Sequence, residues 1–307
     1  MSNLSVILQG AISPYTKNII ESFRNALPGC EIILSTWSFD NDLAELVDSY
    51  ITNIDPGPLP IIYKGEIIRV ENVNRQIIST VEGLKKATKK FSIKWRTDFE
   101  VDPRKLSRFI ESYLIKIESA NLVGTDILIV SSINTANPFA GIGLIGHISD
   151  WVYFGSTKYL RYLMPETIPP LKINTEIPVD RVHKKIFPFA RFSVEQWMLR
   201  DGLNRKFNFY PEFFSAPDLV KKYLQILGVG FIVVNPRNMG LITHKYDDFI
   251  YLRRGSSRKF LGFYLATISQ LDSALLRLPF FRYFGFLLLR LKALIFNFHQ
   301  SLGKTYK

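Results

Sequence analysis

Short apolar runs alternate with helical patterns along residues 4–133, and this alternation constrains the fold more than any other feature. The apolar runs suit buried strands, and they are Leu4–Ile12, Glu31–Trp37, Tyr50–Ile54, Phe91–Thr97 and Asp126–Ile133. Apolar residues at helical spacing fill most of the segments between them. Strands that alternate with helices favour a mostly parallel sheet covered by helices on both faces. We therefore expect an α/β, Rossmann-type fold.

Proline positions predict where helices and loops begin. Ser13-Pro14 predicts an N-cap with proline at the first helical position, and Asp102-Pro103 predicts another helix start. A polar helix is expected over Asn41–Asp48 and an amphipathic one over Asn74–Lys89. The run Asp55–Pro60 predicts a loop, because proline and glycine interrupt regular structure.

Composition fits one large globular domain with an appendage. The chain has 307 residues, of which 47% are hydrophobic and 21% charged. Its single cysteine, Cys30, excludes an intramolecular disulfide and fits a reducing compartment. Residues 1–15 lack the cationic start of a secretory signal. We expect a cytoplasmic protein.

Most of the net charge of +12 lies at the C-terminus. From Arg253 to Lys307 there are ten Lys or Arg residues and one acid, so the other residues carry only +3. This distribution argues against a nucleic-acid partner for the whole protein. It also suggests a division into a main domain over residues 1–250 and a basic extension over residues 251–307.

The C-terminal extension combines aromatic, aliphatic and cationic residues. Its longest uncharged stretch, Phe260–Leu271, has 12 residues, whereas a bilayer span needs roughly 20. An amphipathic, basic pair of helices on the inner face of the cytoplasmic membrane fits this pattern. Core helices packed on the catalytic domain are the alternative.

Charged residues follow the strand Phe91–Thr97, at the end where parallel sheets bind ligands. Asp98 and Glu100 form an acid-x-acid pair that suits Mn²⁺ or Mg²⁺. Asp98 directly follows the predicted strand, and we favour it over Glu100 as the direct ligand. The alternative is that Asp98 pairs with Arg96 or caps the next helix.

Two cations precede these acids in the same strand. Lys94 and Arg96 are two residues apart and share one face. Burying two like charges together is costly unless an anion lies between them. We expect them to balance a phosphate group and Asp98.

Residues after the first two strands are candidates for contacts to a nucleotide. Gln9 and Gly10 end the first strand, where glycine lets the backbone approach a base or ribose. Ser35 and Thr36 end the second and suit ribose hydroxyls, whereas Trp37 is expected in the core. An ordinary turn glycine is the alternative at Gly10.

The loop and helix that follow offer further contacts. Asp55 suits a base or ribose, although Asp before Pro-Gly also begins plain turns. Asn74 and Arg75 open a helix, and free N–H groups with an arginine fork suit a diphosphate. A surface salt bridge is the alternative for Arg75.

Seven blocks occur in an order that resembles the WavE lipopolysaccharide-synthesis family: VILQGAI, LPGCEIILSTW, NIDPG, NVNRQIISTVEGLKKA, IKWRTD, ISDWVYFG and VEQWML. They span Val6–Leu199. The family is similar to nucleotide-sugar glycosyltransferases of the GT-A type. The resemblance implies sugar transfer from a nucleotide-sugar donor to a lipopolysaccharide or capsular glycan acceptor, which includes acceptors built on a lipid. It also implies that Asp98 stands where the family's acid stands, although Phe99-Glu100 follows in place of a full D-x-D.

The last two blocks supply acids for the reaction that this resemblance implies. Inverting transfer needs a carboxylate to take the proton of the acceptor hydroxyl. We expect Glu195 to be this base and Asp150 to bind the acceptor, with Trp151 and Trp197 available for stacking on a sugar ring. The alternatives are a helix cap for Asp150 and a first-turn helix acid for Glu195. A retaining mechanism also stays open.

His244, in ITHKYDD, is a candidate to complete the metal coordination, with a structural role as the alternative. Two other functions stay open. A sugar nucleotidyltransferase would use similar acids, but QGAISPYTK lacks its glycine-rich loop. The second alternative is a non-catalytic protein that binds anions or membranes.

Overall fold

The computed structural model describes residues 2–63, 65–119, 126–132, 135, 145–166, 168, 173–174, 194–210 and 217–242. His244 and the predicted C-terminal extension therefore lie outside the described residues. Among those described, no helix is both long enough and apolar enough to cross a bilayer.

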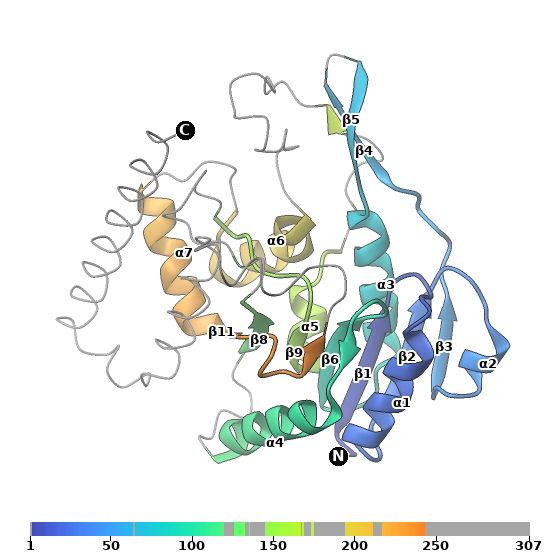
Figure 1. Ribbon diagram of the computed structural model, residues 1–307. Helices are drawn as coiled ribbons and strands as arrows, with labels where there is room; N and C mark the ends of the chain where they lie inside the picture. Colours follow the sequence, from blue (N-terminus) through green and yellow to red (C-terminus); the bar gives the residue numbers. More distant parts are fainter. Residues whose placement is uncertain are drawn as a thin grey trace, which may run out of the picture.

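A seven-stranded sheet forms the centre of the described structure, with the strand order β11-β8-β9-β6-β1-β2-β3 (Figure 1). Six strands run parallel, and β9 lies antiparallel between β6 and β8. Their bounds are Leu4–Gln9 (β1), Glu31–Thr36 (β2), Ser49–Thr52 (β3), Phe91–Arg96 (β6), Leu128–Ser131 (β8), Tyr153–Ser156 (β9) and Phe231–Val234 (β11). The mostly parallel sheet confirms the predicted fold class.

Helices cover both faces of this sheet (Figure 1). Helices α1 and α4 pack on one face, and α3, α5, α6 and α7 pack on the other. Their bounds are Thr16–Ala26 (α1), Val73–Lys86 (α3), Pro103–Ser119 (α4), Thr157–Leu163 (α5), Val194–Phe207 (α6) and Pro217–Gly230 (α7). Both faces of the central strands are consequently apolar, which explains why their sequences are nearly continuous hydrophobic runs.

Strand β1 shows how alternate residues divide between the two cores. Val6 and Leu8 pack in the same core as Phe23 of α1, whereas Ile7 faces the core that contains Ile77 of α3. The approach of α3 to the sheet is close, because a β-carbon at Gly83 would lie 2.4 Å from a methyl carbon of Ile7. The helix thus packs directly on the sheet, and the hydroxyl of its Ser79 donates to the side-chain carbonyl of Gln9 at the end of β1.

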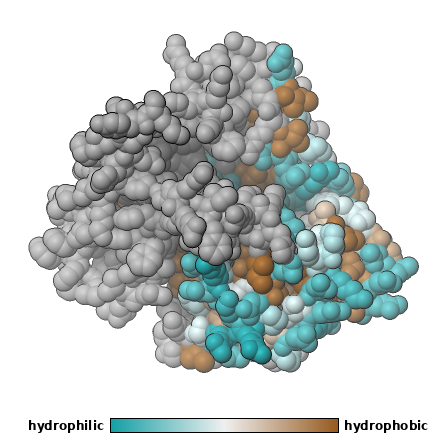
Figure 2. Space-filling view, viewed as in Figure 1, coloured by the Kyte–Doolittle hydropathy of each residue, from teal (hydrophilic) through white to brown (hydrophobic). Residues whose placement is uncertain are grey.

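A hairpin that the sequence pattern did not predict follows the DPGPLP loop. It consists of β4 (Leu59–Tyr63) and β5 (Glu66–Glu71), and β10 (Ile173–Asn174) pairs with β4. Figure 1 shows it extending away from the main sheet, and Figure 2 shows hydrophobic surface on it. Ile67 and Val70 are 63% and 53% exposed there. The sequence predicted a loop over Asp55–Pro60. In the structure this loop already ends at Pro58, because β4 begins at Leu59.

Two helix predictions need correction. Helix α1 begins at Thr16, with Tyr15 at the N-cap position, and the hydroxyl of Ser13 instead donates to the carbonyl of Thr97 at 2.5 Å. The predicted helix Asn41–Asp48 is only one turn, α2 (Asn41–Ala44), capped by the side chain of Asp40. Ser13 thus ties the loop after β1 to the turn after β6.

Candidate active site

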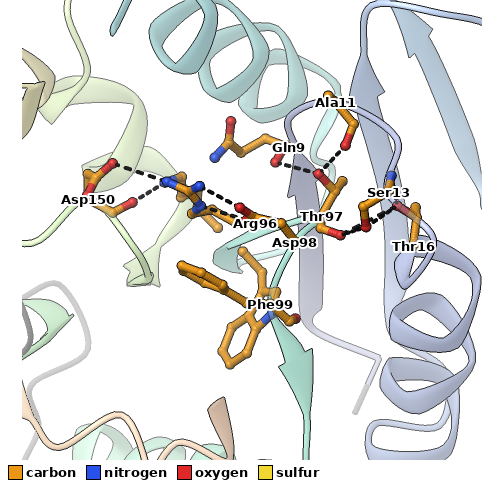
Figure 3. A network of polar contacts seen from close by, with 11 residues as sticks. Gln9, Ala11, Ser13, Thr16, Arg96, Thr97, Asp98, Phe99 and Asp150 are labelled. Carbon is orange, nitrogen blue, oxygen red and sulfur yellow. Dashed lines mark hydrogen bonds and ion pairs between the residues drawn. The ribbon is translucent and has the colours of Figure 1, made fainter. Parts of the chain in front are cut away.

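The turn that ends β6 is fixed through Thr97. The backbone N–H of Thr97 donates to the carbonyl of Gln9 at 3.2 Å, and its hydroxyl donates to the carbonyl of Ala11 at 2.6 Å. Its own carbonyl accepts from Ser13, and Thr16 lies 3.5 Å from the same oxygen. Figure 3 shows this network between the ends of β6 and β1. The turn is therefore built into the sheet rather than left as an adjustable loop.

This turn directs Asp98 back toward Arg96 (Figure 3). Nε and one terminal nitrogen of Arg96 donate to the two carboxylate oxygens of Asp98 at 2.8 and 2.7 Å. The Arg96 side chain is 18% exposed and that of Asp98 is 37% exposed. The structure thus forms the pair that the sequence left as an alternative to direct metal binding.

Arg96 also faces a second acid from a distant segment. Its other terminal nitrogen lies 3.9 Å from Oδ2 of Asp150, which precedes β9. The Asp150 side chain is only 5% exposed. The guanidinium additionally packs over the ring of Phe99, with 4.7 Å from its central carbon to the ring centroid. Arg96 consequently links the ends of two neighbouring strands.

Lys94 lies beneath this ion pair and is fully buried. Its ammonium donates to the backbone carbonyl of Asp150 and lies 5.2 Å from the ring centroid of Tyr153. Burial lowers the pKa of Lys94 to about 8, against the attraction of Asp150, which raises it. A lysine at this depth is tolerated because an oxygen and two carboxylates surround it.

Glu195, at the start of α6, forms a second polar pair with His147. Its Oε2 lies 3.3 Å from Nε2 of His147, and both side chains are mostly buried. Tyr153 is fully buried nearby, and among the described residues its hydroxyl has no hydrogen-bond partner. Burial raises the pKa of Tyr153 well above its usual value, and the charges of Asp150 and Glu195 raise it further. The two acids that the sequence assigned to the acceptor side thus both influence this tyrosine through their charge.

The tryptophans beside these acids are core residues rather than exposed platforms. Trp151 is 2% exposed and packs against Phe99 with ring centroids 4.6 Å apart. Trp197 is 8% exposed, and the guanidinium of Arg200 lies 4.2 Å from its ring centroid. The predicted stacking on a sugar ring does not fit this burial. Trp37, which was expected in the core, is only half-buried.

The carboxyl end of β1 lies beside this cluster, since Gln9 pairs in register with Arg96. The Gln9 side chain is buried and accepts from the hydroxyl of Ser79 on α3 at 2.7 Å. Gly10 has a φ of +127°, and a β-carbon there would lie 2.8 Å from the hydroxyl oxygen of Thr97. Glycine is therefore required at this position by conformation and by space.

The remaining predicted contacts gather around β2, β3 and α3. Arg75 donates to both carboxylate oxygens of Asp55, at 2.7 and 2.6 Å, and this bonding lowers the pKa of Asp55. The hydroxyl of Ser35 accepts from Asn53 at 2.9 Å. Within the described part of the chain, the hydroxyl of Thr36 and the side-chain carbonyl of Asn74 are buried without a hydrogen-bond partner. Buried polar atoms are usually paired, so each of these two is a candidate for a contact with a polar ligand.

The described residues do not assemble the ligand set expected for Mn²⁺ or Mg²⁺. Both oxygens of Asp98 bond to Arg96, and Glu100 lies in the short strand β7 (Glu100–Val101), paired with β12 (Leu241–Ile242). No group of three or more His, Cys, Asp or Glu residues suited to a metal ion occurs among the residues that the structure covers. With His244 outside them, the metal site stays a prediction.

His147 and Tyr153 belong to the candidate site although the sequence patterns did not assign them. Both occur in the HISDWVYFG segment that supplied Asp150. The sequence offered a partial indication of their role, because a histidine and a tyrosine near a candidate acid are polar groups in an otherwise apolar run. Their link to Glu195 depends on the packing of α6 against the sheet, which the segment alone does not encode.

Comparison with known proteins defines the class of this chain. The family model described as WavE lipopolysaccharide synthesis matches residues 4–247. The chain therefore belongs to the WavE lipopolysaccharide-synthesis family. No curated protein has a significant match. Among solved structures, the chain is similar to one titled as a glycosyltransferase involved in the glycosylation of the major capsid of PBCV-1. The two sequences are 12% identical, the match covers 86% of this chain and 98% of that chain, and the TM-score is 0.33.

Proposed function

We propose that this chain is a glycosyltransferase that moves a sugar from a nucleotide-sugar donor to a lipopolysaccharide or capsule-type glycan. Membership of a lipopolysaccharide-synthesis family supports the substrate class. The observation that carries the proposal is the convergence of Arg96, Asp98 and Asp150, which come from two separate segments, at the carboxyl end of β6 beside the end of β1. Ligands of parallel α/β sheets bind at this end.

The donor is proposed to bind between β1, β2 and the start of α3. The unpaired hydroxyl of Thr36 and carbonyl of Asn74 suit the hydroxyl groups of a ribose. Arg75 already binds one bidentate oxyanion, the carboxylate of Asp55, and a diphosphate offers the same geometry.

The acceptor is proposed to bind on the side of β9 and α6. Glu195 would take the proton from the attacking hydroxyl, and the adjacent His147 holds its carboxylate in place at 3.3 Å. Asp150 would accept a hydrogen bond from another hydroxyl of the acceptor.

The acceptor is further proposed to be presented at the inner face of the cytoplasmic membrane, by a lipid carrier or lipid core. This part depends on the sequence alone, since the cationic and aromatic residues of 251–307 suit anionic headgroups. Docking of this segment would bring the catalytic domain to a membrane-bound acceptor.

A panel of nucleotide sugars tests the proposal. The full-length chain is heated with each UDP-, GDP- and CMP-linked sugar, and donor hydrolysis is measured in parallel. We expect one nucleotide class to raise the melting temperature and to be hydrolysed slowly without acceptor. Stabilisation without hydrolysis or transfer would favour a binding protein, and pyrophosphate-dependent formation of a nucleotide sugar would favour a nucleotidyltransferase. Neither binding nor turnover with any donor would contradict the proposal.

A further inference from the structure

Arg96 lies between two carboxylates at the end of β6 (Figure 3). Two of its nitrogens bond to Asp98 at 2.8 and 2.7 Å, and the third lies 3.9 Å from Asp150. Two acids from separate segments that face a common point are a typical cation site. In this chain the positive charge at that point belongs to a side chain.

We propose that Arg96 is the built-in cation of this site and that the Asp98–Asp150 pair binds no divalent cation while Arg96 is in place. A metal ion would have to displace a bidentate, charge-assisted pair in order to reach Asp98. It would also need a second arrangement of the turn. That turn is fixed by the hydrogen bonds of Thr97 to Gln9, Ala11 and Ser13.

The local charge balance supports the same conclusion. Two cationic side chains, Lys94 and Arg96, here lie beside two acidic ones, Asp98 and Asp150. A divalent cation would bring two further positive charges close to the fully buried Lys94. Uncompensated charge at such depth is strongly unfavourable.

The geometry also indicates what the arginine does during the reaction, an extension that rests on the proposed function. A phosphate group offers the same bidentate pair of oxygens as a carboxylate. Asp98 is 37% exposed and can return to water when a phosphate replaces it on Arg96. The carboxylate thus holds the guanidinium in the orientation that the leaving diphosphate requires, and Arg96 supplies the charge for which the sequence suggested a metal.

Binding of Mn²⁺ tests the cation exclusion without any donor or acceptor, so its outcome is separate from that of the proposed function. Free Mn²⁺ is measured by electron paramagnetic resonance in the presence of the purified full-length wild type, Arg96→Ala, and Arg96→Ala combined with Asp98→Asn. We expect Arg96→Ala to bind Mn²⁺ at least about tenfold more tightly than wild type, because a neighbouring positive charge is removed. The double variant should lose this binding. Circular dichroism checks folding, and Arg96→Gln replaces Arg96→Ala if the latter does not fold.

Two results would overturn the inference. The first is a wild-type chain that binds Mn²⁺ and loses the binding in Asp98→Asn. The second is a folded Arg96→Ala or Arg96→Gln variant that binds Mn²⁺ no better than wild type. Once a donor is identified, turnover should persist in excess EDTA, and a loss that Mn²⁺ restores would equally contradict it.

Discussion

Gly10 and Thr97 meet so closely that no larger residue fits at position 10: a β-carbon there would lie 2.8 Å from the Thr97 hydroxyl oxygen. Gly10→Ala is therefore expected to push the turn that carries Arg96 and Asp98. Gly29→Ala is the matched control, since Gly29 also has a positive φ but no heavy atom within 4 Å of the added carbon. Chemical denaturation should show Gly10→Ala to be less stable than the control by about 1–3 kcal/mol. Equal stability of the two variants would contradict the contact.

Lys94 gives the chain a specific pH dependence. Its pKa of about 8 in the folded chain lies below the ordinary 10.5, so between these values the unfolded chain binds more protons. The free energy of unfolding contributed by this group therefore rises with pH across that window, by up to about 3 kcal/mol, and is unaffected by pH below it. The measurement is the difference in unfolding free energy between wild type and Lys94→Met from pH 7.5 to 10. A difference that stays flat or falls would contradict the burial of a charged lysine.

Glu195 is predicted to act in the chemical step rather than in donor binding. Glu195→Gln keeps the size of the side chain but removes the base, so transfer should slow by about 10²–10⁴-fold. Thermal stabilisation by the donor should stay unchanged. Glu21→Gln is the control, because Glu21 is an exposed residue of α1 on another part of the surface. Full transfer activity in Glu195→Gln would assign the base elsewhere.

The predicted membrane association depends on residues 251–307. Removal of Ser257–Lys307 should move the protein from the membrane pellet to the supernatant after cell fractionation. A full-length variant with Gln at Arg277, Arg282, Arg290 and Lys292 tests the electrostatic part and should bind anionic vesicles more weakly than wild type. Unchanged partitioning of the truncated chain would refute the docking role.

The sequence predicted the centre of the fold because its strands are buried on both faces. Runs such as VILQ and EIILST fit few structures other than buried strands in a domain of this size. Their order also predicted which strand ends lie at the ligand-binding edge of the sheet. Strand β9 was not predicted. Its residues Tyr153–Ser156 are too few for a clear pattern, and its antiparallel place between β6 and β8 is set by tertiary packing.

The sequence predicted where individual residues of the candidate site lie, but not how they pair, and their roles stay predictions. Strand alternation placed Lys94 and Arg96 on one face, and the structure has both interacting with Asp150. The sequence left the contact between Arg96 and Asp98 open. Asp98 lies beyond the end of β6, so the direction of its side chain depends on the turn that follows the strand. The hydrogen bonds of Thr97 provide that turn, and they come from a loop that lies more than 80 residues earlier.

The central claim is that the end of β6 receives the diphosphate of a sugar donor, and a crystal structure of the chain with a nucleoside diphosphate tests it most directly. The nucleotide is the one that stabilises the chain in the donor panel. We predict phosphate oxygens within hydrogen-bond distance of Arg96, with the nucleoside beside Thr36 and Asn74. A nucleotide bound elsewhere, with Arg96 still held by Asp98 and Asp150, would contradict the account.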